Sequence, residues 1–139
     1  MITYEFENIP TTTLDILEEI VPIRPGREAL RVSQDRIIEK NFLSNLGLRT
    51  APYQAVEDLN SLYAASKSIG FPAVLKTTRL GYDGKGQINI SSEINFTKIW
   101  SKINFDDCIL EEKINFDREV SILYGKSLNK SECFFPFSE

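Results

Sequence analysis

The chain has 139 residues, of which 42% are hydrophobic and 11% aromatic, enough to bury an ordinary core in one domain or part of one. Its 20 acidic and 16 basic side chains give a net charge of −4, which argues against a nucleic-acid-binding or anionic-membrane surface. Histidine is absent, and Cys108 and Cys133 lack CxxC spacing, which excludes a structural zinc site and a histidine-dependent catalytic triad.

The first elements expected along the chain are a strand and a helix. Residues 2–9 alternate apolar with polar side chains, which is typical of a strand. Residues 11–21 follow with a threonine N-cap and apolar side chains on one helical face, and Pro25 and Gly26 then form a connector. The sequence therefore predicts a strand, a helix and a connector before residue 27.

A second helix is expected over residues 33–46. Ile38, Phe42 and Leu46 recur at steps of four residues, which is the spacing of one helical face. Gly47 stands where helices commonly end in the left-handed conformation. The helix is therefore predicted to stop at this glycine.

The middle of the chain predicts alternating helices and strands around a glycine-rich loop. The expected order is an extended segment (48–56), a helix (57–70), a strand (71–77), the loop (78–86), a strand (87–90), a helix (92–103) and a strand (108–112). Two further strands, joined by a polar turn, are expected at residues 118–125 and 132–137. The pattern is that of an α+β module, without internal repeats or low-complexity tracts.

The string KTTRLGYDGKGQ, which starts at Lys76, holds three of the seven glycines of the chain, Gly81, Gly84 and Gly86. Glycines allow positive φ angles and let backbone N–H groups approach a ligand, so such a loop can form a nest for phosphate oxygens. Lys76 precedes the loop and Lys85 lies within it, and both can pair with phosphate. The alternative is a β-hairpin whose glycines only supply the turn geometry.

Two common phosphate-binding motifs do not fit this loop. A Walker A motif is excluded because Gly86 stands where serine or threonine is required, and because no glycine lies five positions before Gly84. A dinucleotide-binding motif is excluded because the loop leads into a strand and not into a helix. What remains is a loop between two strands that covers phosphate groups.

Such a nucleotide site also needs a strand end that offers backbone groups to adenine and an acid that binds the ribose hydroxyls. Residues 111–114 are the candidate for the first role and Glu119 for the second. The alternative is that Glu111, Glu112 and Glu119 are solvated charges beside strands.

Four segments of the chain carry a resemblance to a known family. In order and spacing, TYEFENI, QDRIIEK, GFPAVLKTTRLGYDGKGQ and EEKINFDREVS resemble the 5-(carboxyamino)imidazole ribonucleotide synthases. These ATP-grasp enzymes are the ATPase half of bacterial phosphoribosylaminoimidazole carboxylase. The resemblance extends over nearly all 139 residues, and GYDGKGQ is its most specific part.

The resemblance implies the fold and its division. The fold class is α/β (α+β), with the small ATP-grasp subdomain, its glycine loop and the start of the larger C-terminal sheet. The implied parts are the end of an N-terminal region (1–26), a linking helix region (27–54), the small subdomain (55–114) and the first strands of the C-terminal subdomain (115–139).

The resemblance also implies the roles of individual residues. ATP would contact Arg36, Lys76, Gly81, Tyr82, Asp83, Gly84, Lys85, Gly86, Gln87, Glu111, Glu112, Lys113, Ile114 and Glu119. The catalytic residues would be Tyr82, Asp83 and Lys85, and the imidazole ribonucleotide would contact Glu5, Glu7, Tyr82 and Lys85. Without the resemblance, Arg36 is expected to form a helix-surface pair with Glu39.

The activity that the resemblance implies is carboxylation of aminoimidazole ribonucleotide in purine synthesis, with ATP, bicarbonate and a carboxyphosphate intermediate. Leu80, where the family usually has another glycine, departs from the pattern. The family's magnesium ligands belong to a C-terminal part beyond residue 139, so we expect no metal ligands here and no activity of the chain alone.

We further expect a cytoplasmic homodimer that contacts neither nucleic acid nor membrane, since the sequence has neither a signal peptide nor an apolar run of spanning length. The alternative function is a non-catalytic nucleotide-binding or assembly module that derives from an ATP-grasp enzyme.

Overall fold

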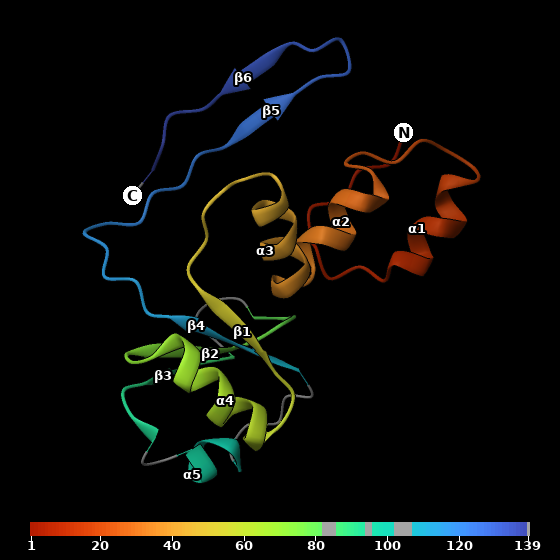
Figure 1. The fold of residues 1–139 in the computed structure, drawn as a ribbon. Coiled ribbons are helices and arrows are strands. Elements are labelled where there is room, and N and C mark those ends of the chain that lie inside the picture. Colours follow the sequence, from red (N-terminus) through yellow and green to blue (C-terminus); the bar gives the residue numbers. More distant parts are fainter. Residues whose placement is uncertain (82–85, 94–95, 102–106, 139) are drawn as a thin grey trace.

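The structure is a computed structural model that describes residues 1–81, 86–93, 96–101 and 107–138. Its helices are α1 (Thr11–Glu18), α2 (Arg27–Ser33), α3 (Arg36–Asn45), α4 (Leu59–Ile69) and α5 (Phe96–Trp100). Its strands are β1 (Tyr53–Val56), β2 (Ala73–Thr77), β3 (Gln87–Ile90), β4 (Cys108–Glu112), β5 (Tyr124–Lys126) and β6 (Glu132–Phe134). Figure 1 shows α3 between the N-terminal helices and the main sheet, and the β5–β6 hairpin apart from that sheet.

The strand predicted for residues 2–9 is wrong. Only an isolated parallel bridge between Ile2 and Ile23 forms there, closed by hydrogen bonds from Ile2 N to Pro22 O and from Arg24 N to Ile2 O, both 2.9 Å. Ile2, Tyr4 and Ile9 instead pack on a small core of Leu14, Ile23 and Leu30. Alternation gives an extended segment one apolar face, but a strand also needs a partner strand that forms hydrogen bonds with it along its length.

The first predicted helix is confirmed as α1, but its threonine cap is wrong, since Pro10 occupies the N-cap position without a side-chain cap bond. Helix α2 was not predicted. Gly26, expected only as part of a connector, also begins this helix, because its carbonyl accepts the N–H of Ala29 at 3.0 Å. A glycine that ends one segment can begin the next, and the sequence pattern alone does not separate the two roles.

Helix α3 confirms the second predicted helix, although it begins three residues later than expected. The Asp35 carboxylate caps it by accepting the N–H groups of Ile37 and Ile38 at 2.9 and 3.1 Å. Gly47 has a φ of 77°, which confirms the left-handed stop. Phe42, on the expected apolar face, stays 45% exposed, so this helix is held by its ends and polar contacts more than by burial.

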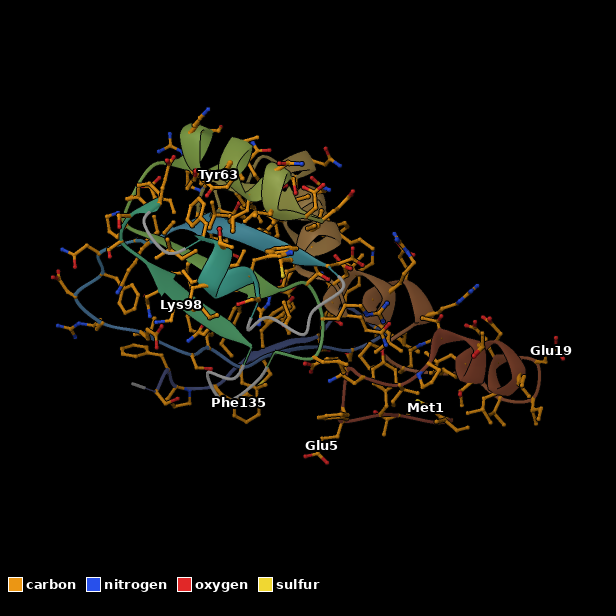
Figure 2. All side chains as sticks on the ribbon, turned by 90° about the horizontal axis from the view of Figure 1, so that it is seen from below. Met1, Glu5, Glu19, Tyr63, Lys98 and Phe135 are labelled. Carbon is orange, nitrogen blue, oxygen red and sulfur yellow. The ribbon has the colours of Figure 1, made fainter. Side chains whose placement is uncertain are left out.

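The order of elements in the predicted middle module is confirmed, but the helix expected over residues 92–103 is described only as α5, and residues 94–95 and 102–103 of that prediction lie outside the described residues. Its four strands form an antiparallel sheet in the order β1-β4-β2-β3, and α4 and α5 cover one face (Figures 1 and 2). Asp58 and Ser61 form a reciprocal cap at the start of α4, and Gly70 ends it. The core between the helices and the sheet comprises Val56, Leu62, Ala65, Ala73, Leu75, Ile90, Phe96, Cys108 and Leu110.

Cys108 belongs to this core as an apolar group. Burial, and secondarily the neighbouring Asp107 carboxylate, raise the pKa of its thiol to about 11. The thiol is therefore neutral at physiological pH, which suits a residue packed among aliphatic side chains.

The two C-terminal strands pair as predicted, but they are shorter. Tyr124 lies opposite Phe134 in the β5–β6 register, and beyond the strands only the bridge between Ser121 and Ser138 continues the pairing. The hairpin leaves many apolar side chains exposed, namely Val120, Ile122, Leu123, Tyr124, Leu128, Phe134, Phe135 and Phe137. In the described residues, no helix is both long and apolar enough to cross a membrane.

Candidate functional site

The side of the sheet that α4 and α5 leave uncovered carries a group of charges. Side chains alternate between the two faces of a strand, so Leu75 and Leu110 face the helices while Lys76 and Glu111 share the opposite face. Lys76 pairs in register with Ile109, two residues before Glu111, which places the two charges on a diagonal. Lys76 Nζ lies 2.8 Å from Glu111 Oε2.

Glu111 has a second cation beside it. Lys40 Nζ, from α3, lies 3.5 Å from Glu111 Oε1 and 5.3 Å from the centre of the Tyr53 ring. The side chain of Glu111 is only 7% exposed, and those of Lys40 and Lys76 are 13% and 24% exposed. The alternative that Glu111 is a solvated charge is therefore wrong, since a carboxylate this buried needs its cations.

The other residues expected around adenine and ribose lie beyond this pair. Glu112, Lys113 and Ile114 are exposed as β4 ends, where the N–H of Lys113 bonds to Pro72 O at 3.0 Å. Glu119 is exposed in the extended segment before β5. That they contact a nucleotide stays a prediction.

Arg36 holds the start of the glycine loop. Its guanidinium donates from Nε to Thr77 O at 3.1 Å and from Nη2 to Gly81 O at 2.7 Å, and its backbone N–H donates to Thr78 O at 2.9 Å. The first residue of α3 is thus fixed to the end of β2, instead of to Glu39 as helix spacing alone suggested. Contact of Arg36 with phosphate remains a prediction.

The loop residues expected to do the chemistry, Tyr82, Asp83, Gly84 and Lys85, lie outside the described residues. At the other end of the loop, Gly86 has a φ of 73°, and its carbonyl accepts the N–H of Thr77 at 2.9 Å. A Cβ at this glycine would lie 3.0 Å from Thr77 Oγ1. Gly86 is therefore required by both its conformation and its close neighbour.

We expect Gly86→Ala to lower the free energy of unfolding by about 1–3 kcal/mol, because alanine is strained at this φ and its methyl group meets Thr77. Chemical denaturation followed by circular dichroism measures the change. Gly125→Ala is the matched control, since a Cβ there has no atom within 4 Å. Equal stability of the two variants would contradict this role of Gly86.

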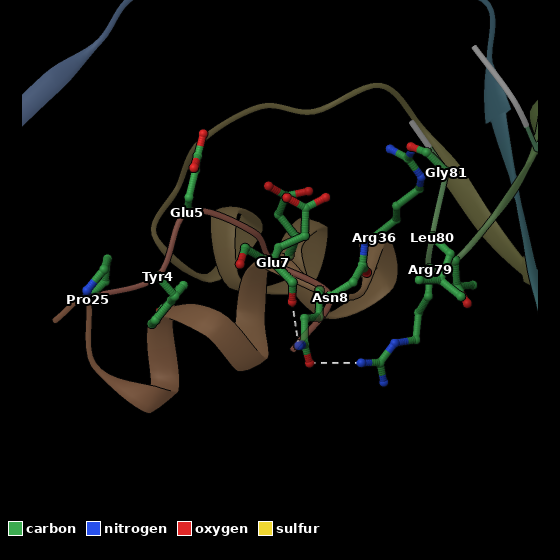
Figure 3. Close-up of a pocket in the computed structure, with 13 residues that line it drawn as sticks. Tyr4, Glu5, Glu7, Asn8, Pro25, Arg36, Arg79, Leu80 and Gly81 are labelled. Atoms are coloured by element: carbon green, nitrogen blue, oxygen red, sulfur yellow. Dashed lines mark hydrogen bonds between the residues drawn. The ribbon is translucent and has the colours of Figure 1, made fainter. Parts of the chain in front are cut away.

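A pocket of about 510 Å³ lies between the N-terminal segment, α3 and the start of the loop (Figure 3). Its lining residues are Tyr4, Glu5, Glu7, Asn8, Pro25, Ser33, Gln34, Arg36, Glu39, Thr78, Arg79, Leu80 and Gly81. The predicted substrate residues Glu5 and Glu7 thus share a pocket with the predicted phosphate residues Arg36 and Gly81. The exposed Glu5 side chain extends outward from the chain (Figure 2).

Gln34 joins the two walls of this pocket. Its Nε2 donates to Ile9 O at 2.5 Å. It also donates to Glu7 O at 2.5 Å, and its Oε1 accepts from Arg79 Nη2 at 2.8 Å; Figure 3 marks these two bonds with dashed lines. Gln34 is buried, so these bonds satisfy its amide. The segment that carries Glu7 is thereby fixed to the entrance of the glycine loop.

Gln34 and Lys40 are site residues that were not predicted, although they are the first and last residues of the run QDRIIEK. Arg36 and Lys40 are four residues apart, which places both on one helical face. This spacing is the feature of the sequence that could have indicated Lys40 as a site residue beside Arg36. Among the described residues, no cluster of three acidic or cysteine side chains could hold a metal ion.

Comparison with known proteins identifies the family. Residues 41–139 match the ATP-grasp domain family. The chain belongs to the ATP-grasp family. Within this family it is 40% identical to the N5-carboxyaminoimidazole ribonucleotide synthase of Brucella melitensis, over all of this chain and 39% of that protein. It is also 39% identical to the bifunctional purine synthesis protein purC/E of Dictyostelium discoideum, over 98% of this chain and 14% of that protein.

Solved ATP-grasp structures agree with the fold. N5-carboxyaminoimidazole synthetase from Staphylococcus aureus, in a structure complexed with ADP, superposes with a TM-score of 0.89 and 34% identity. The match covers 96% of this chain and 36% of that one. The predicted fold class and the resemblance are therefore confirmed, and this ATP-grasp chain spans 39% or less of the length of these relatives.

Proposed function

We propose that this chain forms part of the ATP site and part of the substrate pocket of a 5-(carboxyamino)imidazole ribonucleotide synthase. The observation that carries the proposal is the pocket that Glu7 shares with Arg36 and Gly81. Arg36 also bonds to the carbonyl of Thr77, the residue that follows Lys76 on β2. Relatives of that name cover the whole chain at 35–40% identity, which supports the same assignment.

The reaction joins three reactants in two steps. A bicarbonate oxygen attacks the γ-phosphorus of ATP, which forms carboxyphosphate and releases ADP. The exocyclic amine of aminoimidazole ribonucleotide then attacks the carboxyl carbon, loses a proton and displaces phosphate. Phosphoryl transfer depends mostly on positioning and charge stabilisation, so the protein must place cations and N–H groups around the phosphates.

We assign these roles to residues of the chain as follows. Lys76 and Arg36 neutralise phosphate charge, and residues 81–87 cover the phosphates with backbone N–H groups. Residues 111–114 face adenine and Glu119 binds the ribose. Glu5 or Glu7 faces the imidazole ribonucleotide, together with Tyr82 and Lys85, while Asp83 acts beside them. When bound, magnesium would neutralise charge on the triphosphate, but the described residues hold no group of three acidic or cysteine side chains that fits it.

The proposal also includes a cytoplasmic location and a homodimeric assembly. A second candidate is a nucleotide-binding or assembly module without catalysis, which would use the same contacts to the nucleotide. The two candidates differ in whether the chain supports turnover once it is joined to the remainder of a synthase.

A chimeric enzyme tests this difference. In it, residues 1–139 replace the matching 39% of the Brucella melitensis synthase. We expect the chimera to release ADP only when ATP, bicarbonate and aminoimidazole ribonucleotide are all present, and the 139-residue chain alone to show no turnover. The intact Brucella enzyme is the positive control. A folded chimera that binds ADP but has no turnover would favour the non-catalytic module.

A further inference from the structure

Lys40 is a largely buried cation to which the proposed mechanism gives no role. Its side chain is 13% exposed, lies beside Glu111 and covers the Tyr53 ring. Tyr53 pairs in register with Glu111 across β1 and β4, so Lys40 rests on neighbouring residues of the same sheet face. Burial of a lysine is costly unless it is paired, which suggests that its charge is needed at this place.

The charges around Glu111 indicate what Lys40 does. If Lys76 and Glu111 stood alone, the pair would be neutral and the carboxylate would compete with any anion for the lysine. With Lys40, one carboxylate is shared by two ammonium groups, which leaves a net charge of +1. The two lysines contact different oxygens, Oε1 and Oε2, so Lys76 can move without leaving Glu111 unpaired.

We propose that Lys40 is a positioning residue that keeps Glu111 paired and thereby frees Lys76 to bind a nucleotide phosphate. This inference rests on the proposed function, because it assumes that the anion at Lys76 belongs to an adenine nucleotide. Lys40 acts through Glu111 and does not itself touch the phosphate. Without it, the transfer of Lys76 to a phosphate leaves a nearly buried carboxylate without a cation, which is a large penalty.

A double-mutant cycle tests this mechanism, with ADP titrated into the 139-residue chain by NMR, a method that measures dissociation constants into the millimolar range. We expect Lys40→Met to weaken ADP binding about tenfold. Lys40→Arg keeps the charge and should stay within about threefold of the wild type. In a Glu111→Gln background no carboxylate needs a partner, so there Lys40→Met should change the affinity by less than about twofold.

Three outcomes would overturn this inference while leaving the proposed function intact. They are wild-type ADP binding by Lys40→Met, an equal loss on adding this change to Glu111→Gln, and failure of Lys40→Arg to restore binding. If Lys40→Met does not fold, the Lys40→Met/Glu111→Gln chain is measured, since it contains no buried carboxylate; its failure to fold would make Lys40 a packing residue. If the 139-residue wild type shows no ADP binding, the same cycle is measured in the chimera; absence of ADP binding there would refute the proposed function, and the inference with it.

Discussion

Replacing Lys76 with alanine in the chimeric enzyme is expected to weaken ATP binding by about ten- to a hundredfold. A charge-assisted contact of this kind contributes on the order of 1.5–3 kcal/mol, and each 1.4 kcal/mol corresponds to a factor of about ten in affinity. Lys76 fits this role because it stands on a rigid central strand and its side chain is still 24% exposed. Equilibrium titration with ATP or ADP measures the effect.

The fold should survive this substitution. Glu111 loses its 2.8 Å partner but keeps Lys40, so we expect the free energy of unfolding to fall by only about 1–3 kcal/mol. Lys126→Ala is the matched control, because Lys126 also pairs with a glutamate, Glu132 at 2.9 Å, but lies on the β5–β6 hairpin. Unchanged ATP affinity with a collapse of stability would make Lys76 a structural residue.

The 139-residue chain is expected to self-associate through the β5–β6 hairpin, with a molecular mass that rises with concentration. This hairpin and the segments that flank its strands carry exposed apolar side chains, including Ile122 and Phe137, which are 61% and 70% exposed. A hairpin of two strands is marginal by itself, and its edges offer unpaired backbone groups. Burial of each large apolar side chain contributes roughly 1.5–3 kcal/mol, which favours edge pairing between copies.

Light scattering and hydrogen exchange test this expectation together. Ile122→Lys should shift the chain toward the monomer, whereas Ile20→Lys should not, although Ile20 is also exposed, at 73%, and lies after α1. Amides of residues 120–137 should gain protection as the concentration rises. A chain that stays monomeric at high concentration with a fully protected hairpin would refute the association.

Local signals in the sequence were sufficient for most of the middle module. Asp58 and Gly70 mark the two ends of α4, and the short apolar run before Lys76 predicts β2. These features depend on residues close together in the chain, so their effect on the backbone is largely local. The glycine string likewise indicated a loop between two strands, and Gly86 indeed needs its positive φ.

Tertiary structure decided the remainder. Residues 2–9 alternate as a strand does, but apart from one isolated bridge they have no partner strand. Their own sequence pattern does not indicate whether such a partner strand is present. Glu111 looked like one of three equivalent acids, yet only the register of β2 against β4 and the approach of α3 give it Lys76 and Lys40. Sequence by itself determined where backbone segments begin, end and alternate, because caps, turns and periodicity act within a few residues. Which charges become buried partners depends on contacts between residues 35 and 71 positions apart, and only packing of the folded chain brings those together.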